Sequence, residues 1–280
     1  MASAAIHENL VAQNELQEQS IHCGVSVPQE LRMNGPALSA IVTFHGEGIL
    51  AHTALRSYAL SRSIARQQGV EVQLVLVLDR ADAQTRAFVV DHPELDGSET
   101  IVETQVGDLA LARNAGVSAS RADYICTLDG DDLISTRYFL MHLKEAAQLE
   151  GRFVLHPEMV LSFGMYSAFN WQVDQAGPYY DERALLTVNP WISAAFSTRA
   201  LYEEVPYVAC YPRQTGFGYE DWYWNSETIA RGVVHRLAWG AAYFYRRKWH
   251  GSLNEASHAM KTVIPRTSLF ALGREGQDRV

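Results

Sequence analysis

Apolar residues between positions 38 and 149 follow two alternating patterns. Short apolar runs bounded by glycine, proline or acidic residues predict buried strands at 38–44, 70–78, 100–105 and 124–128. Apolar residues at helical spacing predict helices at 49–67, 83–91, 109–120 and 135–149. Strand and helix therefore alternate four times, which indicates an α/β fold with a doubly wound, mostly parallel sheet.

The pattern changes after residue 150. Strands are predicted at 159–169, 191–197 and 241–245, and a helix at 220–230, with loop-like aromatic stretches between them. In open parallel sheets, ligands bind beyond the carboxyl ends of the strands. The polar residues of most interest are therefore those that directly follow strands, namely His45, Glu47, Asp79 and Asp129.

Composition narrows the class of protein. The 280 residues carry a formal net charge of −9, which disfavours nucleic-acid binding because such binding rests on a basic surface. The three cysteines form no disulfide or metal-binding pattern, which favours a reducing compartment. No apolar run approaches ~18 residues, and no secretory signal is visible. We expect a cytoplasmic protein without a transmembrane segment, and peripheral contact with the inner membrane surface stays open.

The clearest chemical signal is Asp129-Gly130-Asp131-Asp132, in which three carboxylates follow an apolar strand. Like charges this close are costly to bury unless a cation shares the site. Mg²⁺ typically binds one or two protein carboxylates together with waters and substrate phosphates. Gly130 would let the backbone bend and let a phosphate approach. The alternative is an acidic turn in which Asp132 caps the next helix.

A second signal, Gly216-Phe-Gly-Tyr-Glu220-Asp221, brings two acids to the start of a predicted helix. The positive end of the helix dipole stabilises ionised carboxylates there. Combined with a metal site, Asp221 becomes a candidate general base, with Glu220 beside it as a second catalytic candidate. The alternative is the ordinary acidic composition of a helix N-terminus.

Three further features have both a functional and an ordinary interpretation. Arg113 would contact a diphosphate or fix Asp129, or it would face solvent. His250 would be a metal ligand or phosphate donor, or an ordinary surface or core histidine. The cluster Arg246–Lys248 would be a solvated strand end or a contact to phosphate near the site.

At these residues the chain resembles the inverting family 2 glycosyltransferases of the GT-A fold. An ordered set across about residues 38–252 carries the resemblance: the strand Ile41–Phe44, Asp79, Ala112–Gly116, Leu128–Asp132, Glu220-Asp221 and His250. The polar residues 1–36, which end at a Gly-Pro break, are expected to be a leader or linker. The resemblance implies a nucleotide-sugar-binding half at 37–150 and an acceptor-binding and catalytic-base half at 151–254, and a C-terminal helix and tail are expected at 255–280.

The resemblance also implies roles for single residues. His45 and Glu47 would hold the base and ribose of the nucleotide, and Asp79 would bond the base. Asp129 and Asp131 would form the DxD motif, with Asp131 as the direct metal ligand. Asp221 would deprotonate the acceptor hydroxyl, and His250 would lie on the metal or diphosphate side. Phe44-His45 and Leu78–Asp82 depart from the family's usual sequences, which leaves the nucleotide open.

The expected function is a Mn²⁺- or Mg²⁺-dependent transfer of a sugar, with inversion, from a nucleoside-diphosphate sugar to a hydroxyl of a glycan or lipid-linked glycan. One alternative is a Mg²⁺-dependent phosphotransferase or nucleotidyltransferase, although the acidic cluster follows the fourth strand and His45–Gly48 lacks a basic residue. Another is a catalytically inactive GT-A scaffold, against which the joint presence of Asp129, Asp131 and Asp221 argues.

Overall fold

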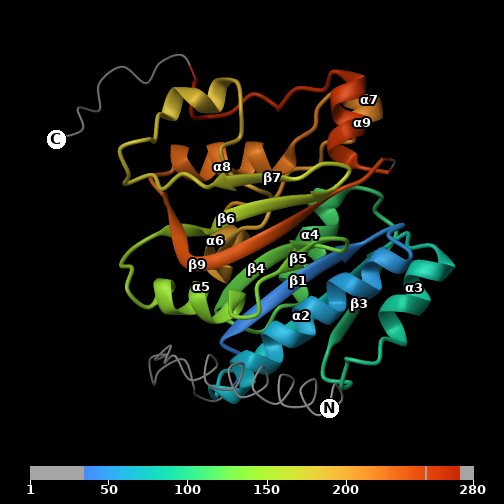
Figure 1. Ribbon diagram of the computed structural model, residues 1–280. Coiled ribbons are helices and arrows are strands. Elements are labelled where there is room, and N and C mark those ends of the chain that lie inside the picture. The colour runs from blue at the N-terminus through green and yellow to red at the C-terminus, as the bar shows by residue number, and fades with distance from the viewer. Residues whose placement is uncertain (1–34, 250, 272–280) are drawn as a thin grey trace, which may run out of the picture.

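The computed structural model describes residues 35–249 and 251–271, and these residues build one nine-stranded sheet with helices around it (Figure 1). The strand order is β3-β2-β1-β4-β8-β6-β9-β5, with β7 paired to β6. The strands are β1 (Leu38–Phe44), β2 (Val72–Asp79), β3 (Thr100–Thr104), β4 (Tyr124–Asp129), β5 (Leu133–Ile134), β6 (Phe153–Gly164), β7 (Ala168–Trp171), β8 (Phe196–Thr198) and β9 (Val234–Arg247).

The helices at 49–67, 83–90, 109–119, 138–146 and 220–230 follow the order that the sequence predicts, whereas those at 182–186, 199–204 and 212–215 lie where it predicts no helix. The helices are α2 (Ile49–Gln67), α3 (Ala83–Val90), α4 (Leu109–Ala119), α5 (Tyr138–Ala146), the 3₁₀ helix η2 (Glu182–Leu186), α6 (Arg199–Glu204), α7 (Pro212–Thr215), α8 (Glu220–Ala230) and α9 (Leu253–Met260). The bounds of β1, α2 and α8 equal the predicted ones, and β2, α3, β3, α4 and β4 differ by one or two residues at an end. None of these described helices is long and apolar enough to cross a bilayer.

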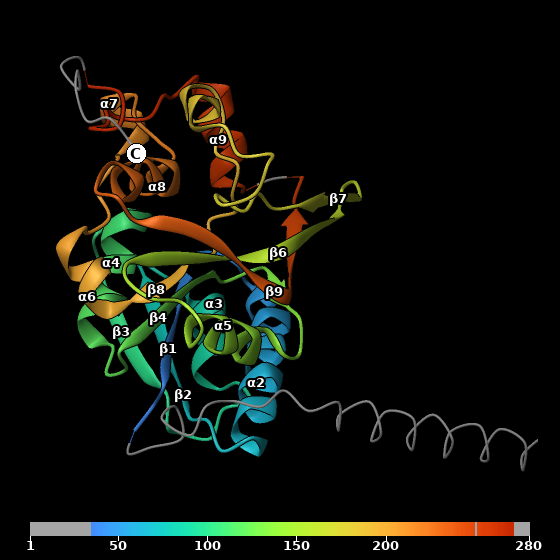
Figure 2. The same ribbon diagram turned by 90° about the vertical axis from the view of Figure 1, so that its left-hand side faces the viewer.

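Two layers of helices cover the central strands. Every residue of β1 and β2 is buried, because both faces of these strands pack against helices. Leu38 and Ala40 belong to the core shared with α2, α3 and α5, whereas Ile41 belongs to the core shared with α4, α6 and α8. The view in Figure 2 shows α2 and α5 on one side of β1 and β2, with α4 and α6 on the other. The doubly wound α/β architecture is confirmed.

The sheet is parallel only in its first half. β1 pairs in parallel with β2 and β4, and β2 pairs in parallel with β3. Beyond β4 the sheet is mixed, because β8 runs antiparallel to both β4 and β6, whereas β9 runs parallel to β6. The expected parallel sheet therefore describes the region that ends at the acidic turn, and a mixed extension follows it.

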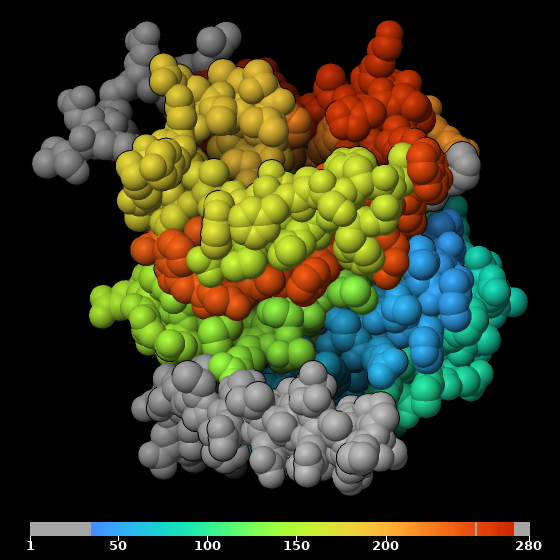
Figure 3. Space-filling view, in the orientation of Figure 1, coloured from blue at the N-terminus to red at the C-terminus, as the bar shows by residue number. Residues whose placement is uncertain are grey.

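The strand predictions beyond residue 150 differ most from the structure. The predicted strand at 159–169 is instead a hairpin of β6 and β7, because Gly164 turns the chain at a φ of 106°. The predicted strand at 241–245 is the central part of the much longer β9, in which Gly240 has a φ of 82°. A register shift between Pro157 and Met159 interrupts its pairing with β6. Figure 3 shows the yellow-green hairpin lying along the orange residues of β9.

Candidate active site

The acidic turn after β4 is fixed against β1 and α2. A side chain at position 130 would collide with the carbonyl oxygen of Thr43 and the ring of Phe44, so Gly130 lets the turn lie directly on β1. The hydroxyl of Tyr58, on α2, donates a hydrogen bond to the carbonyl oxygen of Asp129 at 2.6 Å. The glycine therefore serves the packing of the turn, a reason that the sequence pattern did not indicate.

Asp129 and Asp131 have different partners. Oδ1 of Asp129 accepts a hydrogen bond from Nη2 of Arg113 at 2.9 Å, and its Oδ2 accepts one from Oγ of Ser193 at 2.7 Å. Oδ2 of Asp131 forms an ion pair with Nζ of Lys248 at 2.6 Å. Both oxygens of Asp129 are thus occupied by the protein, whereas Asp131 has an ion pair through one oxygen and is the freer ligand.

Asp132 joins the turn to β9. Its Oδ1 accepts a hydrogen bond from the backbone N–H of Arg246 at 2.6 Å, and its Oδ2 accepts one from the hydroxyl of Tyr243 at 2.9 Å. Burial raises the pKa of Asp132 well above its ordinary value, and the charges of Asp131 and Asp129 add to this. The interpretation of Asp132 as a helix cap is wrong, because Arg137 occupies the N-cap position of α5.

The motif Ala112–Gly116 attaches α4 to its surroundings on two sides. A side chain at Gly116 would collide with Ile41, so this glycine lets α4 lie close to β1. The side-chain amide of Asn114 bonds the backbone of Tyr207, donating to its carbonyl oxygen at 2.8 Å and accepting from its N–H at 3.0 Å. These contacts fix the position of Arg113 between them.

Arg113 links the acidic turn to the start of α8. Its side chain is 1% exposed, and its Nη1 donates to Oε1 of Glu220 at 2.6 Å while Nη2 binds Asp129. The guanidinium also lies over the ring of Tyr207. Of the interpretations considered for Arg113, the structure displays the one in which it fixes Asp129, and the solvent-facing one is wrong.

Replacing Arg113 by methionine should destabilise the fold by about 3–5 kcal/mol, because two partly or fully buried carboxylates lose their shared cation. Urea unfolding followed by circular dichroism measures this loss. The control is Arg152→Met, which removes an exposed ion pair of similar length, 2.7 Å, to Glu204. That change should cost less than about 1 kcal/mol. Equal losses for the two variants would contradict a stabilising role for the buried bridge.

Asp221 is the more accessible of the two acids at the start of α8. Glu220 is 7% exposed and ion-paired to Arg113, whereas Asp221 is partly exposed and its Oδ2 accepts a hydrogen bond from Nδ2 of Asn189 at 3.0 Å. Burial raises the pKa of Asp221, and the charge of Arg113 opposes this. A carboxylate with a raised pKa and open access has the properties of a proton acceptor.

The loop before α8 is held by a segment near the C-terminus. The N–H of Gly218 donates to the carbonyl oxygen of Val263 at 2.9 Å, and the N–H of Val263 donates to the carbonyl oxygen of Gly216 at 3.1 Å. A β-carbon at position 218 would lie 2.7 Å from the hydroxyl oxygen of Thr262, so the two segments pack too closely to leave room for a side chain there. Tyr219 then enters α8 in the left-handed region, with a φ of 59°.

The residues expected to hold the nucleotide lie at the carboxyl ends of β1 and β2. Nδ1 of His45 lies 2.7 Å from the carbonyl oxygen of Asp79, and the N–H of His45 donates to Oε2 of Glu47 at 2.6 Å. Oδ1 of Asp79 accepts hydrogen bonds from the hydroxyl of Thr104 at 2.9 Å and from the N–H of Gly107 at 3.1 Å. Asp79 is therefore rigidly held, which suits either a structural or a base-binding carboxylate.

The charges at and beside the acidic turn affect the pKa of Glu47. Burial raises the pKa of Glu47, the charge of Asp131 acts in the same direction, and the charge of Lys248 opposes it. The structure therefore joins the ends of β1, β2 and β4 and the start of α8 into one region. His250 lies outside the described residues, as do residues 1–34 of the expected leader and residues 272–280 of the expected tail.

Sequence reasoning missed two residues of this region. Ser193 and Asn189 bind the two acids Asp129 and Asp221, and both come from the irregular stretch before β8. The predicted strand at 191–197, which contains Ser193, is wrong in its bounds, because β8 covers only Phe196–Thr198. Asn189 lies in a stretch that the sequence assigns to a loop, and a serine or asparagine there carries no signal of its own. Lys248 belongs to the basic cluster that the sequence left open, and its ion pair with Asp131 places it at the acidic turn.

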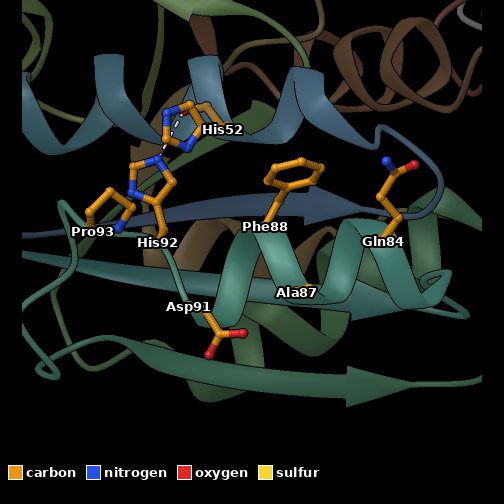
Figure 4. A pocket seen from close by; sticks show the side chains of 7 residues that line it. All are labelled: His52, Gln84, Ala87, Phe88, Asp91, His92 and Pro93. Carbon is orange, nitrogen blue, oxygen red and sulfur yellow. Dashed lines mark hydrogen bonds between the residues drawn. The ribbon is translucent and has the colours of Figure 1, made fainter.

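A surface pocket of about 430 Å³ lies between α2 and α3, away from these acids (Figure 4). It is lined mainly by apolar atoms and contains none of the candidate site residues. In Figure 4 the rings of His52, His92 and Phe88 lie along one side, and Nε2 of His92 is 3.0 Å from the carbonyl oxygen of His52. The lining residues are His52, Gln84, Ala87, Phe88, Asp91, His92 and Pro93.

The family model of glycosyl transferase family 2 matches residues 39–201, which is more than half of the chain. The chain belongs to glycosyl transferase family 2. The expected family is thus confirmed. One curated family relative is an uncharacterised glycosyltransferase, EpsJ of Bacillus subtilis, which is 31% identical over 86 residues. The match covers 31% of this chain and 25% of EpsJ.

Solved structures similar to this family 2 chain show its fold. S. aureus TarS 1-349 in complex with UDP-GlcNAc has a TM-score of 0.56 at 16% identity, over 77% of this chain and 59% of that one. The mannosyltransferase PcManGT of Pyrobaculum calidifontis, in complex with GDP-Man and Mn²⁺, has a TM-score of 0.53 at 15% identity, over 89% and 68%. Glucosyl-3-phosphoglycerate synthase of Mycobacterium tuberculosis, in complex with Mn²⁺, UDP and phosphoglyceric acid, has a TM-score of 0.54 at 12% identity, over 81% of this chain and 75% of that one. The expected GT-A fold is confirmed.

Proposed function

We propose that this protein transfers a sugar from a nucleoside-diphosphate sugar to an acceptor hydroxyl, with inversion at the anomeric carbon. The observation that carries the proposal is the Arg113 bridge, because one guanidinium binds both Asp129 and Glu220. It brings the acidic turn at the end of β4 next to the candidate base on α8. Family 2 membership and the nucleotide sugars in the TarS and PcManGT complexes support such a donor.

The residues present fit a divalent cation that is shared with the donor. Asp129 and Asp132 have both carboxylate oxygens bound by the protein, which leaves Asp131 as the ligand. Among residues 35–249 and 251–271, no group of three or more His, Cys, Asp or Glu is arranged to hold a metal ion. Mg²⁺ and Mn²⁺ accept one protein carboxylate when phosphate oxygens and waters complete the shell. When bound, the cation would neutralise charge on the departing diphosphate.

Asp221 is the proposed general base. Its carboxylate takes the proton of the acceptor hydroxyl while the hydroxyl oxygen bonds to the anomeric carbon. The bond from that carbon to the diphosphate oxygen breaks in the same displacement, so the configuration inverts. Asn189 orients the carboxylate, and Glu220 positions the start of α8 through Arg113. A positioned base of this kind contributes about 10²–10⁴-fold to the rate.

The remaining roles divide between the two halves of the chain. His45, Glu47 and Asp79, at the ends of β1 and β2, are the proposed contacts to the base and ribose in the half at 37–150. The half at 151–254 would bind the acceptor, which we propose to be a glycan or lipid-linked glycan. His250 keeps its proposed role on the metal or diphosphate side of the site.

The test is a panel of UDP, GDP and dTDP sugars incubated with the protein and Mn²⁺, with release of nucleoside diphosphate as the readout. We expect release from one nucleotide class and its loss in EDTA. Release of sugar 1-phosphate, together with nucleoside monophosphate or, when pyrophosphate is added, with nucleoside triphosphate, would favour a phosphotransferase or nucleotidyltransferase. Metal-dependent binding without any release, even with a panel of glycan acceptors, would favour the inactive scaffold.

A further inference from the structure

Among residues 35–249 and 251–271, three basic side chains contact the acidic turn at residues 129–132: Arg113, Arg246 and Lys248. A departing nucleoside diphosphate carries several negative charges, so a site that binds it gains from a cationic side chain that can reach the phosphate oxygens. Which of the three can do so depends on burial and on existing partners.

Arg113 and Arg246 are committed to the protein. Arg113 is 1% exposed, and its two terminal nitrogens bind Asp129 and Glu220. Nε of Arg246 donates to the carbonyl oxygen of Asp131 at 2.8 Å, and its Nη2 donates to the hydroxyl of Thr53 at 3.1 Å. Moving either guanidinium toward a ligand would break contacts that hold the turn.

Within the part of the chain that the structure describes, Lys248 forms one ion pair, and it follows the last residue of β9. Its Nζ lies 2.6 Å from Oδ2 of Asp131, and its side chain is 21% exposed. Lysine presents a compact charge on a flexible four-carbon stem with three rotatable donors, which suits a group that changes partner. Lys248 therefore combines a charge at the acidic turn with the freedom to leave Asp131.

We propose that Lys248 is a donor-binding residue whose ammonium group contacts the diphosphate of the nucleotide sugar. This inference rests on the proposed function. In the free protein Lys248 neutralises Asp131. In the donor complex its ammonium group bonds phosphate oxygens, and Asp131 becomes available to a divalent cation.

Two effects of opposite sign follow from this exchange. Lys248 and a divalent cation compete for Asp131, so removing the lysine charge should strengthen binding of the cation alone. The same change removes a charged hydrogen bond to the diphosphate, so it should weaken binding of the nucleotide. A lysine that only stabilised the fold would not produce such a pair of effects.

The experiment compares the full chain with Lys248→Met and Lys248→Arg. Free Mn²⁺ is measured by electron paramagnetic resonance in the absence of nucleotide, and UDP, GDP and dTDP are titrated calorimetrically at saturating Mn²⁺. For Lys248→Met we expect severalfold tighter Mn²⁺ binding and about 10–100-fold weaker nucleotide binding. Uridine and guanosine, which lack phosphate, should bind both proteins equally.

The matched control is Arg247→Met, which removes one positive charge from the adjoining residue. The guanidinium of Arg247 stacks on Tyr166 and Tyr245, and its Nε bonds Ser162 at 3.4 Å, so it faces away from the acidic turn. The nucleotide affinity of Arg247→Met should stay within about threefold of that of the unmodified protein, because its guanidinium contacts Tyr166, Tyr245 and Ser162 instead of the acidic turn.

The outcomes separate the two proposals. Nucleotide binding by Lys248→Met within twofold of the unmodified protein would overturn the role of Lys248, even if Mn²⁺ bound more tightly. The same applies if Arg247→Met weakens nucleotide binding as strongly. If the unmodified protein binds none of UDP, GDP and dTDP with Mn²⁺, the proposed function fails and this inference fails with it. Should Lys248→Met lose its circular dichroism signal, Lys248→Gln replaces it in both titrations.

Discussion

Asp221→Asn is expected to lower turnover by about 10²–10⁴-fold while leaving the affinity for nucleoside diphosphate within about twofold. The amide keeps the size of the side chain and its contact with Asn189, but it cannot accept the acceptor proton. Transfer to a glycan acceptor, followed by release of nucleoside diphosphate, measures turnover, and calorimetry measures binding. A variant that retains more than a tenth of the turnover would refute the assignment of the base.

The pH profile provides an independent check of the same residue. Asp221 must be ionised to act as a base, so turnover is present above its pKa and is lost as the pH falls through it. Because burial raises this pKa, the acid limb should lie above the ordinary value for aspartate of about 3.9. The residual activity of Asp221→Asn should lack this limb. Asp123→Asn, an exposed control whose side chain is 95% accessible, should leave rate and profile unchanged.

Asp131→Ala should reduce metal-dependent turnover by about 10³-fold or more, because it removes the carboxylate that the cation needs and several kcal/mol of charge stabilisation. The melting temperature should change little, since Asp131 forms one ion pair at the edge of the site and its loss relieves repulsion on Asp132. Nucleotide affinity in Mn²⁺ should fall to that measured in EDTA.

The contrast between neighbouring acids sharpens this expectation. Asp132→Asn alters a buried carboxyl that binds Tyr243 and the backbone of Arg246, so it should act mainly on stability. Asp131→Ala should act mainly on metal response. If Asp131→Ala kept Mn²⁺-stimulated turnover within tenfold of the unmodified protein, the metal would have to bind elsewhere, and the proposed role of the acidic turn would be wrong.

The first half of the fold follows closely from the sequence because burial there is simple. β1 and β2 are covered on both faces and therefore read as mostly apolar runs, interrupted by Ser39, Thr43 and Gln73. In the second half, Gly240 divides a long strand into two short patterns, and β9 was recognised only in part. A glycine inside a strand carries the same sequence signal as a turn, and only the pairing with β6 distinguishes the two.

The site was predictable where a residue follows an element and unpredictable where a contact is long-range. The acids at positions 129, 131 and 221 follow a strand or begin a helix, and sequence patterns locate such positions. The partners Ser193 and Asn189 come from an irregular stretch, and no local pattern links them to Asp129 and Asp221. Likewise, the sequence offered three interpretations of Arg113, and its exposure of 1% excludes the solvent-facing one.

The backbone pairing of Val263 with Gly216 and Gly218 makes the segment around Val263 a support of helix α8, which carries the proposed base. Shortening the protein past this point would remove no proposed catalytic or donor-binding side chain, yet it would release the loop that sets the direction of α8. Such a truncated protein should no longer activate the acceptor hydroxyl, although it should still bind the nucleotide. An assay of donor binding alone would report it as intact.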